Sequence, residues 1–134
     1  SPEDFYNRGR VYYYLSEFEK AEKELKTAWE KEYAPAAVYL GKVYVEANEP
    51  EKAKDMYQKC LKQDELKAEA YNGLAYCSME QEDYEKALEY IQKGLEVKDR
   101  SRDFASAKEK MQQYLAQYPA DAAAVKENYF LQTR

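Results

Sequence analysis

Residues 34–67 read APAAVYLGKVYVEANEPEKAKDMYQKCLKQDELK, and the next 34 residues, 68–101, read AEAYNGLAYCSMEQEDYEKALEYIQKGLEVKDRS. When the two segments are aligned, ten positions are identical, far more than unrelated segments of this length share. The identical pairs are Ala34/Ala68, Ala36/Ala70, Leu40/Leu74, Glu46/Glu80, Glu51/Glu85, Lys52/Lys86, Ala53/Ala87, Gln58/Gln92, Lys59/Lys93 and Leu61/Leu95. A fixed period of this length is typical of repeat proteins, in which each copy is a small unit that packs on its neighbours.

A third copy precedes these two. An offset of 32 residues aligns it with residues 34–67, and two residues are missing from the link near Tyr33. The coinciding pairs are Gly9/Gly41, Val11/Val43, Tyr12/Tyr44, Glu19/Glu51, Lys20/Lys52 and Ala21/Ala53. The chain therefore divides into units at about residues 2–33, 34–67 and 68–101, which we expect to lie in one domain covering residues 1–134.

Each unit is predicted to contain two helices. Along residues 34–45, and again along residues 53–61, apolar side chains recur at intervals of three and four, which is the spacing of one helical face. Pro50 separates the two patterns, because proline cannot continue a helix. Similar patterns over residues 101–117 and 121–132 predict two more helices. We therefore expect an all-α protein of about eight helices.

The composition excludes several classes of function. Its 21 Lys and Arg are outnumbered by 26 Asp and Glu, and the net charge of −5 does not suit nucleic acid. The chain has no His, which removes His-based catalysis and His metal ligands. Its four Gly form no phosphate-binding loop, and two Cys cannot build a zinc site. We expect no enzyme, no cofactor, no metal, no nucleic-acid partner and no direct membrane insertion.

The units resemble the tetratricopeptide repeat. The middle unit carries the family pattern through Leu40, Gly41, Tyr44, Ala53, Tyr57 and Cys60; the third through Tyr71, Leu74, Ala75, Tyr84, Ala87, Ile91 and Gly94; and the first through Phe5, Gly9, Tyr12, Phe18, Ala21, Leu25 and Ala28. Arg8 departs from the pattern, as does the missing closing Pro of each unit. The resemblance implies a right-handed α-solenoid of stacked antiparallel helix pairs, in which residues 102–134 form a degenerate or capping pair. It also implies a non-catalytic protein–protein interaction module.

Small residues are predicted where helices approach closely. Gly9, Gly41 and Ala75 occupy equivalent positions in the first helices, where a larger side chain would push the partner helix away. Ala21, Ala53 and Ala87 are expected to meet them from the second helices. Five tyrosines are expected to pack within or between units: Tyr12, Tyr44, Tyr57, Tyr71 and Tyr84.

The concave side of such a stack is lined by the first helix of each unit, and residues not needed for packing should face it. The candidate peptide-binding residues are Tyr6, Arg10, Tyr13, Tyr39, Lys42, Asn72, Tyr76 and Met79. Spacing adds Glu3, Val38, Val45 and, from the last pair, Arg102, Ala105 and Gln112. Tyrosine is favoured on recognition surfaces because it joins a flat apolar ring to a hydroxyl. We expect this aromatic groove to bind a protein or peptide, as an extended segment or a partner helix.

Two further possibilities are weighed on particular residues. Some members of the family grip the C-terminal carboxylate of chaperone tails. The matching positions here hold Tyr6, Arg10, Tyr39, Glu69 and Gly73. Only Arg10 is cationic, and Glu69 would repel the carboxylate of such a ligand, so we reject that mode. An apolar end at Tyr129, Phe130 and Leu131 favours self-association through the C-terminal helix, as a structural scaffold segment of a longer repeat protein.

The third possibility is an accessory domain of an enzyme encoded outside these residues. The chain opens on Ser1 rather than Met, and we expect it to be an excised or processed segment. Its compartment therefore stays open between cytoplasmic and exported.

Overall fold

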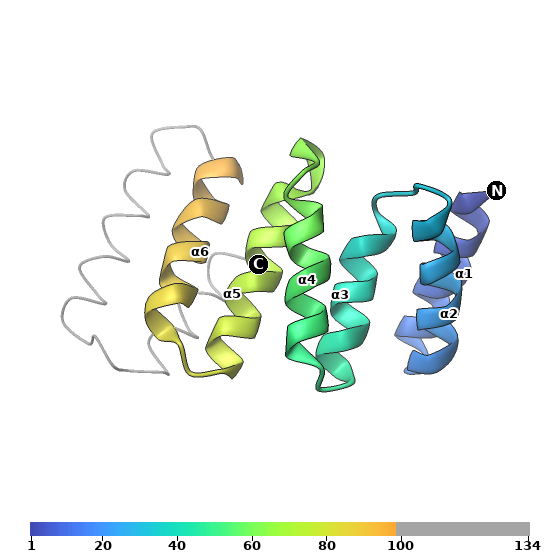
Figure 1. The fold of residues 1–134 in the computed structure, drawn as a ribbon, viewed down its shortest axis with the longest axis horizontal. Coiled ribbons are helices and arrows are strands. Elements are labelled where there is room, and N and C mark those ends of the chain that lie inside the picture. Colours follow the sequence, from blue (N-terminus) through green and yellow to red (C-terminus); the bar gives the residue numbers. More distant parts are fainter. Residues whose placement is uncertain (99–134) are drawn as a thin grey trace.

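The computed structural model describes residues 1–98, which form six α-helices and one short 3₁₀ helix (Figure 1). The helices are α1 (Pro2–Tyr14), α2 (Phe18–Glu30), α3 (Ala36–Glu46), α4 (Pro50–Cys60), η1 (Asp64–Leu66), α5 (Lys67–Glu80) and α6 (Tyr84–Lys98). The predicted all-α class and the two helices per unit are confirmed for these residues. The helices expected over residues 102–134, including the one expected to self-associate, lie outside the described residues.

The helices are arranged as antiparallel pairs placed side by side (Figure 1). Within the pairs, α1 packs on α2, α3 on α4 and α5 on α6. Neighbouring pairs join through the contacts of α2 with α3 and of α4 with α5. The first helices also touch one another, because α3 contacts both α1 and α5. The three first helices are therefore neighbours along one side of the stack.

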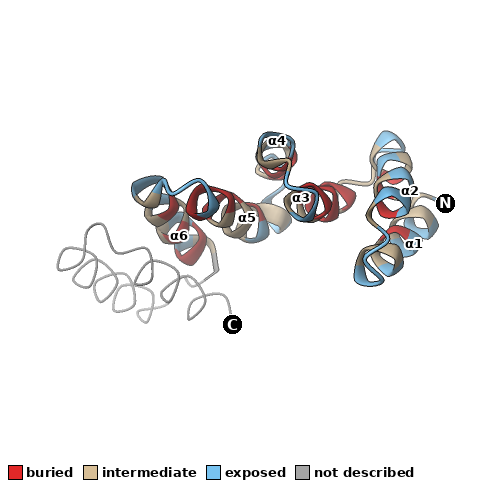
Figure 2. Ribbon diagram, turned by 90° about the horizontal axis from the view of Figure 1, so that it is seen from below, coloured by how far each residue is buried: buried red, intermediate tan, exposed pale blue. Residues whose placement is uncertain are grey.

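The buried faces of the helices point toward one another, as Figure 2 shows in red. Ala21, Leu25 and Ala28 form the fully buried face of α2, spaced by four and three residues. Helix α3 is the most enclosed, and its run from Ala36 to Gly41 is buried without interruption. This run follows from its position, because α3 has helices on several sides while α2 buries only one face.

Tyr57 of α4 lies between two glycines from different pairs. A Cβ added at Gly41 of α3 would lie 2.6 Å from both Cε1 and Cζ of Tyr57 and 3.0 Å from Cδ1. A Cβ added at Gly73 of α5 would collide with the same three ring carbons. The Tyr57 side chain itself is 4 % exposed. Both glycines are therefore required by packing, since the ring occupies the space that a side chain would need.

The turns within the pairs share one geometry. Ser16, Asn48 and Glu82 hold positive φ angles of 61°, 58° and 60°. The residue after each turn donates its N–H to the carbonyl oxygen five positions earlier, as in Glu49 to Tyr44 at 2.8 Å. This is the Schellman arrangement, which satisfies the free carbonyls at a helix end and usually places glycine at the left-handed position.

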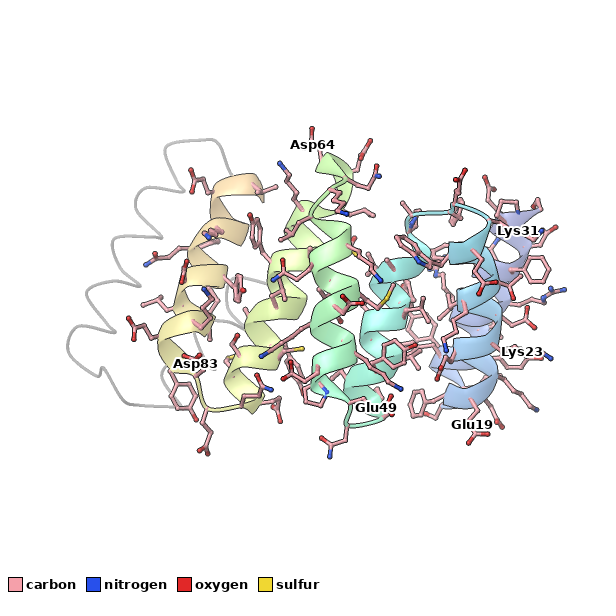
Figure 3. All side chains as sticks on the ribbon, in the orientation of Figure 1. Glu19, Lys23, Lys31, Glu49, Asp64 and Asp83 are labelled. Atoms are coloured by element: carbon pink, nitrogen blue, oxygen red, sulfur yellow. The ribbon has the colours of Figure 1, made fainter. Side chains whose placement is uncertain are left out.

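Several charged side chains lie near the ends of the helices. Glu19, Glu49 and Asp83 lie along one edge of the molecule, close to the turns within the pairs, and Asp64 lies at the opposite edge (Figure 3). Charges placed there stay hydrated.

Two cysteines are free and buried, Cys60 in α4 and Cys77 in α5. Burial raises the pKa of the Cys60 thiol to about 12 and that of Cys77 to about 11. Both thiols are therefore protonated at neutral pH and act as small apolar groups in the core. No helix within residues 1–98 has the length and apolar character needed to span a membrane.

The Tyr57 contact predicts different outcomes for two glycine substitutions. Gly41→Ala should lower the free energy of unfolding by about 1–3 kcal/mol, because the new methyl group overlaps the ring. Gly94→Ala is the matched control, since its Cβ would lie 3.4 Å from Asn72 and Tyr71 atoms. It should be neutral or stabilising by up to about 1 kcal/mol through helix propensity. Urea unfolding followed by circular dichroism measures both, and equal effects would contradict the packing described.

The shared turn predicts a second pair of outcomes. Glu82→Gly should stabilise the chain by roughly 0.5–1 kcal/mol, because glycine adopts the left-handed conformation without steric cost. Asn48→Gly should change stability by less, since asparagine already tolerates this conformation. Thermal unfolding of the two variants against the parent chain measures the difference. A lower melting temperature for Glu82→Gly would show that the turn is held differently.

Candidate functional site

The candidate site is a groove of about 640 Å³. Helices α1, α3 and α5 supply almost all of its lining, and Tyr57 is the contribution of α4. The lining residues are Tyr6, Arg10, Tyr13, Tyr39, Lys42, Val45, Glu46, Tyr57, Glu69, Asn72, Gly73 and Tyr76. The first helices of three pairs thus build one surface, which no single pair could form.

Helical spacing brings these side chains to the groove. On α1, Tyr6 is followed by Arg10 and Tyr13 at intervals of four and three, so all three share one face. The same spacing places Tyr39, Lys42 and Glu46 together on α3, and Glu69, Asn72 and Tyr76 together on α5. Each helix therefore contributes one stripe, and the stripes lie next to each other.

Tyr39 is the centre of an aromatic cluster. Its ring centroid lies 5.8 Å from that of Tyr6 and 5.7 Å from that of Tyr13, both edge to face. Its hydroxyl shares a hydrogen bond of 3.0 Å with the hydroxyl of Tyr14. Tyr39 is 9 % exposed. It therefore joins α1 to α3 and presents only a small part of its surface to the groove.

Two cations lie against the Tyr39 ring. The Arg10 guanidinium carbon is 5.3 Å from the Tyr39 centroid and 5.4 Å from that of Tyr6, and the Lys42 ammonium is 4.5 Å from the Tyr39 centroid. Arg10 Nε is buried without a hydrogen-bond partner. Across residues 1–98, neither cation forms an ion pair with a carboxylate. Aromatic rings rather than acids hold both charges in place.

The groove also contains two carboxylates, those of Glu46 and Glu69. Burial raises the pKa of Tyr6, and Glu69 adds to the rise. Burial likewise raises the pKa of Tyr13 and of Tyr76, with Glu46 contributing to both. These phenols are therefore protonated at neutral pH and can donate hydrogen bonds to a ligand.

Seven of the eight candidate residues line the groove, and Met79 does not. Met79 is 2 % exposed and belongs to a buried cluster with Ala75, Ala87 and Ile91. The prediction was wrong for Met79 because this cluster joins α5 to α6. Whether the seven bind a ligand stays a prediction.

Of the additional residues that spacing placed in the groove, only some line it. Val45 lines it. Val38 is 2 % exposed inside the core, because α3 is enclosed on several sides, and the exposed Glu3 lies outside the lining. Arg102, Ala105 and Gln112 lie outside the described residues.

Glu46 and Tyr57 were missed as lining residues, while Glu69 and Gly73 were considered only for a chaperone tail. A signal existed for Glu46, since it follows Lys42 by one helical turn and so shares its face. No signal existed for Tyr57, because it belongs to the second helix of its pair. Its ring lies against Gly41 and Gly73 and also lines the groove. The part of the chain that the structure describes contains no cluster of His, Cys, Asp and Glu able to hold a metal ion.

Comparison with known proteins bears on the family. No curated protein matches the chain. The sequence model of the tetratricopeptide repeat family matches residues 39–99, which begin in α3 and include all of α4, α5 and α6. That family is typically non-catalytic, and no enzyme family is detected. The resemblance drawn from the sequence is confirmed over this range. Residues 39–99 therefore match the tetratricopeptide repeat family, whose domains are generally protein-interaction modules.

Proposed function

We propose that this chain is a non-catalytic binding module that holds a peptide or a partner helix in the groove of α1, α3 and α5. The observation that carries the proposal is that side chains from three successive helix pairs converge on one groove of about 640 Å³. A surface shared by several pairs suits an elongated ligand, because successive ligand residues meet equivalent positions of successive repeats.

The chemistry of the lining supports a protein ligand. Tyr6, Tyr13 and Tyr76 offer flat apolar rings for side chains and hydroxyls for peptide carbonyls. Lys42 and Arg10 add charge against these rings. Interfaces are enriched in tyrosine and arginine, and tyrosine buries a large area at a small loss of conformational freedom.

The complete domain is part of the proposal. We place residues 1–134 in one domain, with units at about 2–33, 34–67 and 68–101. In this proposal the pair predicted over 102–134 extends the stack to about eight helices, as a right-handed α-solenoid. Three described pairs in contact support it, since each further pair covers an apolar face that would otherwise stay exposed.

A truncation pair tests the groove. Peptides selected from a displayed random library against the native chain provide ligands, and their dissociation constants are measured by fluorescence anisotropy. Tyr76→Ala should weaken binding on the order of tenfold, the loss typical of a central aromatic contact. Tyr90→Ala is the matched control, because this half-buried tyrosine of α6 does not line the groove.

Circular dichroism of both variants verifies that they remain folded. Equal weakening by Tyr76→Ala and Tyr90→Ala would contradict binding in the groove, and so would a library that yields no ligand for the native chain.

A further inference from the structure

The charges of the groove follow an order along its helices. Glu69 lies in the first turn of α5, and its charge helps to raise the pKa of Tyr6, which is near the start of α1. Glu46 lies at the end of α3, and its charge helps to raise the pKa values of Tyr13 and Tyr76, which are in the second halves of α1 and α5. The two carboxylates therefore mark opposite ends of the groove.

The cations occupy the middle. Arg10 and Lys42 both lie within 6 Å of the Tyr39 centroid, at 5.3 Å and 4.5 Å. Within residues 1–98, neither cation has a carboxylate partner. Arg10 Nε also lacks a hydrogen-bond partner. An anionic side chain bound in the groove near Arg10 and Lys42 would supply the negative charge that neither cation has as an ion-pair partner.

From this order we infer that the groove selects an extended peptide segment in which one acidic side chain is flanked on both sides by basic side chains. The inference rests on the proposed function and names the ligand that this site would take. The acidic side chain meets Arg10 and Lys42, and the basic side chains meet Glu46 and Glu69.

The helix geometry sets the spacing on one side. Glu46 follows Lys42 by four residues, so the two positions are separated by about 6 Å along the α3 axis. An extended peptide advances about 3.3 Å per residue. The basic residue that meets Glu46 should therefore lie about two positions from the acidic residue.

The same order disfavours other ligands. A polyacidic segment would place carboxylates against Glu46 and Glu69, and the phosphate backbone of a nucleic acid would do the same. A uniformly basic segment would meet Arg10 and Lys42 in the middle. Only an alternating segment satisfies all four charges.

The displayed library provides the first test. Peptides enriched on the native chain should share an acidic residue with basic residues about two positions away on at least one side and further basic residues on the other. The best peptide is then synthesised with amidated and acetylated ends, together with a form in which the basic residue facing Glu46 is replaced by Glu. The replacement should weaken binding on the order of tenfold.

Charge reversal in the protein identifies the contact. Glu46→Lys should lose affinity for the original peptide and regain it for the Glu-substituted peptide. Glu65→Lys is the matched control, because Glu65 is exposed in η1 and outside the groove lining, and it should leave both affinities within about twofold. Melting curves of the variants show that the fold is kept.

The outcomes separate this inference from the proposed function. If enriched peptides bind with a loss at Tyr76→Ala but carry no common charge order, or if Glu46→Lys fails to rescue the substituted peptide, the charge order is wrong and groove binding stands. If the library yields no peptide that depends on Tyr76, both are wrong.

Discussion

The ring of Tyr57, enclosed between Gly41 and Gly73, is the contact on which the arrangement of the helix pairs depends. It extends from α4 of the second pair, and it fills the space against both α3 of its own pair and α5 of the next. Helices without side chains at the contact can approach closely, so one ring sets the spacing of three helices. Because Tyr57 also lines the groove, the spacing of α3 and α5 and the shape of the candidate site have the same origin.

Buried and exposed residues of the groove have different roles. Tyr39 is almost fully buried and joins α1 to α3, while it also holds Arg10 and Lys42 through its ring. Fixing cations on aromatic rings keeps their charge available, whereas an acid partner would neutralise it. Rigid placement of these groups before binding lowers the entropy lost when a ligand is ordered.

The repeat in the sequence predicted much of this architecture. The 34-residue period located the helices of the second and third units, and helical spacing alone placed Tyr6, Arg10 and Tyr13 on one face of α1. The same spacing was sufficient for α3 and α5 except where helices enclose a residue on a second side. Val38 and Met79 are such residues, and a pattern within one helix does not report which other helices surround it.

The close contacts were predicted less well, because they depend on neighbouring units. The three atoms nearest to a Cβ added at Gly41 all belong to Tyr57, and this contact was not predicted. Gly73 was not identified as a packing residue, since it aligns with Tyr39 and departs from the repeat at that position. The glycine at position 73 leaves space for the Tyr57 ring, and this role becomes clear only from the packing of α5 on α4.

Proton NMR tests the Tyr57 contact most directly. Three adjacent carbons of the Tyr57 ring surround the side-chain position of each glycine, so Gly41 and Gly73 lie over the ring and their Hα protons experience its ring current. Both glycines should show an Hα resonance well upfield of the random-coil position, and Tyr57→Leu should abolish both shifts. Random-coil Hα positions for Gly41 and Gly73 in the folded native chain would contradict the packing on which this account of the fold and the groove depends.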